Sequence, residues 1–187
     1  MNIVYGGSFN PPTLAHEKIV DLLIKTFNPK NIIIVPTADN YTWKNITNFS
    51  DRFNMAKIAF PKALISDIEN QNVMYKGTYY TLDKLSIAYK DIYFCMGADN
   101  LINIKKWINY TELLNKYHFI VFKRDNIDID LFINNELNEY KEKFIIVDFN
   151  EVISSTMFRI NKDTNLVSKD VLEYIKKNKL YQEVSYE

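Results

Sequence analysis

Two short stretches of this chain combine residue types that can bind and polarise phosphate groups. In the first, the glycine pair Gly6 and Gly7 follows an apolar run, and Thr13 and His16 stand where a helix is expected to begin. Glycine lets the backbone approach a ligand closely, and the free N–H groups at the start of a helix attract an anion. His16 would lie in the first turn, able to donate a hydrogen bond to a phosphoryl oxygen. Taken alone, such a stretch is more often a tight turn that carries a solvated histidine.

The second stretch runs from Ile153 to Arg159 and opens another predicted helix. Ser154 or Ser155 can cap this helix, and their hydroxyl groups with the free amides form a second place for an anion. Arg159 is one of only three arginines in a lysine-rich chain, and its planar guanidinium can bind phosphate oxygens in pairs. The simpler interpretation is an ordinary capped helix with an exposed arginine.

Neither stretch has the spacing of the P-loop or of the dinucleotide fingerprint. Together they resemble the signatures of the nucleotidyltransferase superfamily, in particular those of the nicotinate/nicotinamide mononucleotide adenylyltransferases. The matching patterns are Gly-Gly-Ser-Phe-Asn-Pro-x-Thr-x-x-His and Ile-Ser-Ser-Thr-x-x-Arg. Bacterial nicotinate enzymes usually carry a histidine at the position of Thr13, and the Thr-x-x-His form is closer to that of eukaryotic nicotinamide-nucleotide enzymes. Because the two motifs occur together, we prefer a phosphate site to a pair of ordinary turns.

The resemblance implies a role for each matching residue. His16 would contact the α-phosphate of ATP, Thr13 an adjacent phosphate, and Arg159 would complete the catalytic set. Further contacts to ATP and its phosphates would come from Gly6, Gly7, Ser8, Phe9, Lys44, Gly97, Asp99, Ser154, Ser155 and Thr156. The pyridine mononucleotide would lie against Tyr80, Thr81 and Trp107. Mg²⁺ would bridge the ATP phosphates with water ligands, and no residue of the chain is expected to form a metal site.

Three of these assignments have a plain structural alternative. Lys44 is as well explained by a solvated charge in a polar loop, Asp99 can cap a helix, and Trp107 can be a core residue. The resemblance favours stacking on the pyridine ring for Trp107, both roles can hold together for Asp99, and the two interpretations of Lys44 have equal weight. Arg52, by contrast, begins a predicted helix and is expected to be structural.

The elements that must position these residues follow from hydrophobic periodicity. Short β-branched and aromatic runs predict strands over Asn2–Tyr5, Asn31–Pro36, Leu64–Ser66, Ile92–Met96, His118–Phe122 and Phe144–Val147. Helical spacing predicts helices over Thr13–Phe27, Ser50–Phe60, Thr81–Tyr89, Ala98–Ile104, Tyr110–Asn115, Ile129–Tyr140, Ser155–Asn161 and Lys169–Asn178. This alternation predicts an α/β protein, a doubly wound parallel sheet with helices on both faces. The resemblance makes that fold Rossmann-like, with its ligand beyond the carboxyl ends of the strands.

Length and composition set wider bounds. The 187 residues, 47% of them hydrophobic, are expected to form one nucleotidyltransferase domain, residues 1–187. A formal net charge of zero gives no indication of a nucleic-acid partner, and no apolar run reaches the roughly 18 residues of a membrane span. The single cysteine, Cys95, is expected to be buried and fits a reducing compartment, so a cytoplasmic location is expected. Assembly into a homo-oligomer is left open.

The expected activity is the transfer of AMP from ATP to nicotinate mononucleotide, with release of pyrophosphate, in NAD biosynthesis. A preference for nicotinamide mononucleotide, or use of both acceptors, is the first alternative, because Thr13 replaces the histidine of the bacterial enzymes. A transferase for another phosphate acceptor, such as pantetheine phosphate, shares the first motif but usually lacks the Gly-Ala-Asp segment with its later tryptophan. A nucleotide-binding module without catalysis is the third alternative.

Overall fold

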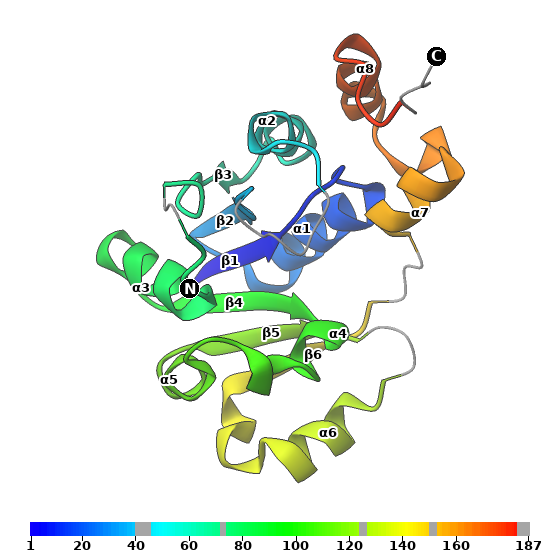
Figure 1. The fold of residues 1–187 in the computed structure, drawn as a ribbon. Coiled ribbons are helices and arrows are strands. Elements are labelled where there is room, and N and C mark those ends of the chain that lie inside the picture. The colour runs from blue at the N-terminus through cyan, green and yellow to red at the C-terminus, as the bar shows by residue number, and fades with distance from the viewer. Residues whose placement is uncertain (40–45, 72–73, 124–126, 150–152, 183–187) are drawn as a thin grey trace.

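A computed structural model describes residues 1–39, 46–71, 74–123, 127–149 and 153–182 (Figure 1). Six parallel strands form one sheet in the order β3-β2-β1-β4-β5-β6. Their bounds are β1 Asn2–Gly7, β2 Asn31–Pro36, β3 Leu64–Ile65, β4 Ile92–Gly97, β5 His118–Phe122 and β6 Phe144–Val147. The order reverses between β1 and β4, so a crevice opens at the carboxyl ends of these two neighbours.

Helices cover both faces of the sheet, as predicted (Figure 1). One face packs against α1 Leu14–Phe27, α2 Phe49–Ala59, α7 Ser155–Asn161 and α8 Lys169–Lys177. The other face packs against α3 Thr78–Ala88, α4 Ala98–Leu101, α5 Tyr110–Lys116 and α6 Ile129–Glu136. Short 3₁₀ turns add η1 Ile104–Lys106, η2 Asn138–Lys143 and η3 Thr164–Leu166. The fold is therefore the Rossmann-like doubly wound sheet that the sequence predicts.

Alternating side chains of the inner strands explain why helices are needed on both sides. In β1, Ile3 and Tyr5 face the layer of α1 and α2, while Val4 faces the layer of α3 and α5. Successive side chains of a strand point to opposite faces, so an unbroken apolar strand is buried only when both faces are covered. Cys95 of β4 is completely buried in the first layer, as expected, and burial raises the pKa of its thiol well above the ordinary value.

The predicted strands β2, β5 and β6 and helix α7 have the bounds that the structure shows. Two predicted helices are interrupted. The stretch Ala98–Ile104 divides into α4 and η1, and Ile129–Tyr140 divides into α6 and η2. In the second case Leu137 has φ −138° and ψ 27°, outside the helical region, so the helix ends although the apolar spacing continues. In the described part of the chain, no helix is long and apolar enough to cross a membrane.

Helix α1 meets the beginning of α8 at an acidic side chain. Oε1 of Glu17 is buried and has no hydrogen-bond partner among the described residues. Burial raises the pKa of the Glu17 carboxyl above its ordinary value of 4.5, and a hydrogen bond with Ser168 lowers it in part. Because the folded pKa is raised, the carboxyl favours folding most at a pH below its unfolded pKa. That contribution is lost as the pH rises through the folded pKa.

We therefore expect Glu17→Gln to raise the melting temperature at neutral pH by about 1–3 °C, because the neutral amide needs no buried charge. The gain should shrink as the pH falls toward the pKa of a free glutamate. Thermal unfolding at a series of pH values measures it. Glu173→Gln on α8 is the control, because Glu173 is exposed and its substitution should change little. A wild-type protein that is more stable than Glu17→Gln at neutral pH would contradict this account.

Candidate active site

A cavity of about 530 Å³ lies at the point where the strand order reverses. The ends of β1 and β4, the beginning of α1 and the beginning of α7 line it. Ten of the predicted site residues belong to this lining: Gly6, Gly7, Ser8, His16, Gly97, Asp99, Ser154, Ser155, Thr156 and Arg159. The structure thus brings the two sequence motifs, nearly 150 positions apart, to a single cavity.

The glycine pair belongs to strand β1 instead of the turn after it. Gly6 and Gly7 pair with Val35 and Pro36 of β2, so the ladder continues to the edge of the cavity. A Cβ atom on Gly7 would lie 3.0 Å from the Phe9 ring, closer than ordinary van der Waals contact. The Phe9 ring therefore packs closely against the backbone at Gly7 and leaves no room for a side chain there.

Phe9 supports the cavity from behind and is absent from its lining. Its ring is 1% exposed and makes edge contacts with Tyr5, His16 and Phe60, at centroid distances of 5.4, 5.3 and 5.4 Å. The sequence predicts a contact between Phe9 and ATP. The structure instead gives its side chain a packing role beside His16, and any ligand contact would have to come from its backbone.

His16 is oriented by the residue that caps its helix. The Thr13 amide donates to Nδ1 of His16 at 3.0 Å, and Oγ1 of Thr13 lies 2.7 Å from the same nitrogen. A ring nitrogen that accepts from an amide carries no proton, so the proton of the neutral imidazole is on Nε2. His16 also lines the cavity. This arrangement presents a neutral N–H donor there, the group that suits a phosphoryl oxygen.

Thr13 itself is fully buried and does not line the cavity. The direct phosphate contact predicted for it differs from what the structure shows, because its hydroxyl is turned toward the His16 ring. The Thr-x-x-His spacing places the cap and the ring three residues apart, which is the distance of a capping box. Thr13 is therefore placed to set the tautomer and orientation of His16.

On the β4 side, Gly97 and Asp99 form a compact unit. Gly97 precedes the first residue of α4, and a Cβ atom there would lie 2.5 Å from Oδ1 of Asp99. The carboxylate is thus folded over the glycine at the cavity wall. An acceptor at this place can bind ribose hydroxyls or other donors of a nucleotide. Gly97 rather than Asp99 occupies the N-cap position, so the alternative role considered for Asp99 does not apply.

The second motif binds directly to the backbone of the first. Oγ of Ser155 donates to the Pro11 carbonyl at 2.8 Å, and Nη1 of Arg159 donates to the Asn10 carbonyl at 2.7 Å. Nη2 of Arg159 donates to Oγ1 of Thr156 at 3.1 Å, which leaves the threonine hydroxyl able to donate elsewhere. Ser154 caps α7 by accepting from the Met157 amide, at 3.2 Å. The Ser155 proton is engaged, so Thr156 and Arg159 are the better donors for a ligand.

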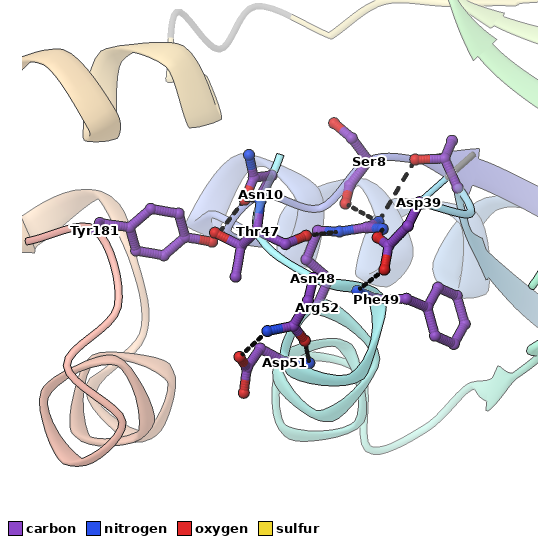
Figure 2. A network of polar contacts seen from close by, with 10 residues as sticks. Ser8, Asn10, Asp39, Thr47, Asn48, Phe49, Asp51, Arg52 and Tyr181 are labelled. Atoms are coloured by element: carbon purple, nitrogen blue, oxygen red, sulfur yellow. Dashed lines mark hydrogen bonds and ion pairs between the residues drawn. The ribbon is translucent and has the colours of Figure 1, made fainter. Parts of the chain in front are cut away.

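Figure 2 shows a buried arginine of α2 that holds the loop after β1. Arg52 is 0% exposed; its Nη1 donates to the Ser8 carbonyl at 3.0 Å, and Nε donates to the Thr47 carbonyl at 2.6 Å. Nη2 forms an ion pair with Asp39 at 2.8 Å. Arg52 thus joins the ends of β1 and β2 to the start of α2, which agrees with the structural role expected for it.

The three predicted pyridine contacts do not line this cavity. Trp107 follows η1 and makes an edge contact of 6.1 Å with Phe94, whose ring also lies against Gly6. Thr81 is buried in α3 and donates to Glu69 at 3.1 Å, and Tyr80 lies near the ammonium groups of two lysines, Lys76 and Lys84. Trp107 is therefore separated from the glycine pair by one ring. A pyridine site at these residues stays a prediction.

Lys44, the other predicted phosphate contact, falls outside the described residues. Further lining residues were not predicted: Tyr5, Ala15, Ile19, Ile46, Met96, Asn100, Phe122, Phe149 and Ile153. Most are apolar and come from strands, from α1 and from connecting segments, so only the fold brings them to the cavity. The carbonyls of Asn10 and Pro11 also accept hydrogen bonds from the second motif, and no side-chain pattern reveals such contacts. Among the described residues, no group of three or more His, Cys, Asp or Glu side chains is placed to hold a metal ion.

A parallel sheet of this order, with a cavity at its reversal point, is the Rossmann-like doubly wound architecture, which binds ligands at that point. The model of the cytidylyltransferase-like family matches residues 4–161. A probable nicotinate-nucleotide adenylyltransferase of Acholeplasma laidlawii is 40% identical over 190 residues, covering 98% of this chain and 99% of that protein. One of Fusobacterium nucleatum is 38% identical over 187 residues, covering 93% and 96%. The chain belongs to the cytidylyltransferase-like family, and within it to the nicotinate-nucleotide adenylyltransferases.

Solved structures agree with this placement. The nicotinic acid mononucleotide adenylyltransferase of Plasmodium falciparum complexed with APC is 25% identical, with a TM-score of 0.78 and 96% of both chains covered. The same protein complexed with NaAD has a TM-score of 0.80 at 24% identity, again over 96% of both chains, and shows the likeness of fold.

Proposed function

We propose that this chain transfers AMP from ATP to nicotinate mononucleotide, forming deamido-NAD and pyrophosphate. The observation that carries the proposal is that residues of both motifs line the same cavity. Arg159 and Ser155 of α7 hold the carbonyls of Asn10 and Pro11, and His16 lines the same space. Side chains from both ends of the chain that can donate to phosphate oxygens thus meet at one cavity, which supports a triphosphate site there. The names of the relatives supply the acceptor.

In the proposed reaction, an oxygen of the acceptor's 5′-phosphate attacks the α-phosphorus of ATP. A new phosphorus–oxygen bond forms, and the bond from the α-phosphorus to the bridging oxygen of the β-phosphate breaks. The attacking oxygen is already ionised, so no strong general base is needed. The protein contributes alignment and stabilisation of charge. The N–H of His16 would donate to an α-phosphoryl oxygen, where negative charge has to be stabilised.

The leaving pyrophosphate would be held by the α7 side of the cavity. The guanidinium of Arg159 has five N–H donors, and the contacts with Asn10 and Thr156 use only part of them. The Thr156 hydroxyl and the backbone amides of Ser8 and Ser155 are further donors in our assignment. We place the α-phosphate against the end of β1, where Gly6 and Gly7 line the cavity.

Nucleotidyltransferases generally use a divalent metal together with ATP. We assign Mg²⁺ to this role, because Mg²⁺ is usually held by phosphate oxygens, water and one or two carboxylates. The cavity fits such an ion, since the Asp99 carboxylate lies at its wall beside Gly97. When bound, the ion would neutralise charge on the phosphates.

The second candidate acceptor is nicotinamide mononucleotide. Thr13 favours it, since the Thr-x-x-His form resembles that of the nicotinamide-nucleotide enzymes. We place the pyridine ring near Trp107, with Tyr80 and Thr81 at the start of α3. The donors or acceptors there would decide between a carboxylate and a carboxamide. A cytoplasmic location and a single functional unit over residues 1–187 are part of the same proposal, and assembly into a homo-oligomer is left open.

Pyrophosphate release on mixing ATP and Mg²⁺ with each acceptor tests the proposal. We expect rapid release with nicotinate mononucleotide, slower release with nicotinamide mononucleotide and none with pantetheine phosphate. A reversed order of the two mononucleotides would support the second candidate. Release with pantetheine phosphate alone, or with no acceptor, would contradict both.

A further inference from the structure

The chain returns to the first motif after its last helix. Helix α8 ends at Lys177, and the Leu180 amide donates to the Ile175 carbonyl at 3.0 Å, which folds the following residues back. This turn delivers Tyr181 to a largely buried position. Its ring makes an edge contact with Phe158 of α7, with centroids 5.7 Å apart. Position 181 therefore lies against the helix that carries Arg159.

The Tyr181 hydroxyl reaches across to the loop between β1 and α1, as Figure 2 shows. It donates to Oδ1 of Asn10 at 2.8 Å, and the Thr47 amide donates to the same oxygen at 3.2 Å. The backbone of Tyr181 is held as well, because Nζ of Lys162 at the end of α7 donates to its carbonyl at 2.9 Å. Tyr181 thus bridges α7 and Asn10, and both of its ends are fixed.

Asn10 is the residue whose carbonyl receives Arg159. Its side chain and its carbonyl are held by different segments: the side chain by Tyr181 and Thr47, the carbonyl by the guanidinium. The residue is 1% exposed, so water cannot readily replace a lost donor. A change at the Tyr181 hydroxyl would therefore move the carbonyl against which Arg159 is aligned.

We propose that Tyr181 is a positioning residue of the phosphate site, which holds Asn10 so that Arg159 and the first motif stay aligned. The proposal rests on the proposed function for its kinetic consequences. Tyr181 does not line the cavity and touches no substrate in this account. It acts through Asn10, and the hydroxyl rather than the ring is the acting group.

The chemistry of the phenol suits this task. Burial raises the pKa of Tyr181 to about 12, and a hydrogen bond with Thr47 and the nearby charges of Arg159 and Arg52 lower it only in part. The hydroxyl therefore keeps its proton at any pH at which the enzyme would work, so it remains a donor to Asn10. The hydrogen bond from Tyr181 to Asn10 is therefore independent of pH over that range.

Tyr181→Phe is the direct test, because it removes the hydroxyl and keeps the ring on Phe158. We expect kcat/KM for ATP to fall about 3- to 10-fold, the size of one lost hydrogen bond, while KM for nicotinate mononucleotide is unchanged. The same variant combined with Asn10→Ala should lose little more than Asn10→Ala alone, because the two residues act as one unit.

Tyr174→Phe is the matched control. Tyr174 lies on α8, and its hydroxyl also makes two side-chain hydrogen bonds, donating to Asp51 and accepting from Asn54, but it does not touch the first motif. We expect a similar fall in melting temperature for both variants, and a fall in kcat/KM for ATP only in Tyr181→Phe. Equal kinetic effects in the two variants, or none in Tyr181→Phe, would overturn the proposal.

Calorimetric binding of ATP with Mg²⁺ separates this proposal from the proposed function. If the wild-type protein binds ATP but transfers no AMP, the proposed function fails. A weaker affinity of Tyr181→Phe for ATP, with Tyr174→Phe unchanged, would still support the positioning role. If Tyr181→Phe binds ATP as tightly as the wild type and its kinetics are unchanged, the positioning role is contradicted, whichever mononucleotide is the acceptor.

Discussion

We expect His16→Ala to lower kcat for adenylyl transfer by about 10²- to 10³-fold, the usual effect of removing one donor from a charge that develops during reaction. KM for ATP should change less, because the donor matters most when the α-phosphate carries additional charge. Steady-state pyrophosphate release at saturating substrates measures this. The reason lies in the Thr13 amide, which fixes the His16 proton on the nitrogen opposite Nδ1.

His118→Ala is the control for this prediction, because His118 is the only other histidine of the chain. It is the first residue of β5, at the amino ends of the strands and so at the opposite end of the sheet from the cavity, and it stacks on Tyr93 with centroids 5.0 Å apart. We expect kcat to be retained in this variant. Normal turnover of a folded His16→Ala protein would remove His16 from the catalytic set.

The second large effect is expected at Arg159. Arg159→Ala should lower kcat/KM for ATP by about 10²-fold or more, since it removes a charged donor to the phosphates and releases the Asn10 carbonyl. Arg159→Lys should recover only a small part of this loss. A lysine ammonium cannot hold the Asn10 carbonyl and Thr156 at once in the geometry of a planar guanidinium.

Initial rates at varied ATP, with nicotinate mononucleotide saturating, separate these variants. Lys177→Ala removes an exposed cation near the end of α8 and should behave as the wild type. If Arg159→Lys were as active as the wild type, charge alone would explain Arg159. The contact with the first motif would then have no role in the reaction.

Much of the fold was predictable because its periodicity is strong. The apolar runs of β2, β5 and β6 are bounded by polar residues, and their observed limits match the predicted ones. The end of β1 was harder to predict, because a glycine pair is typical of a turn. In the structure the backbone of Gly6 and Gly7 continues the pairing with β2. Gly77, with a φ of +90°, starts α3 three residues earlier than the apolar pattern indicates.

The site was predictable at the level of its motifs and less so at the level of contacts. Glycine, hydroxyl and arginine residues at helix starts point to phosphate, and the structure gathers most of them at one cavity. The burial of Thr13 follows from its hydrogen bonds with a ring three residues away, which spacing permits but does not require. Arg159 and Ser155 donate to backbone carbonyls. Because every residue has a carbonyl, the sequence does not indicate which ones are used. Only the fold determines that the acceptors are the carbonyls of Asn10 and Pro11.

The fate of the α-phosphate of ATP tests the central claim most directly. With ATP carrying ³²P at the α-position, nicotinate mononucleotide and Mg²⁺, we predict that the label moves into the dinucleotide product, while the released pyrophosphate stays unlabelled. Label found in AMP or ADP without a dinucleotide would contradict the account, because the two motifs would then serve ATP hydrolysis or nucleotide binding instead of adenylyl transfer.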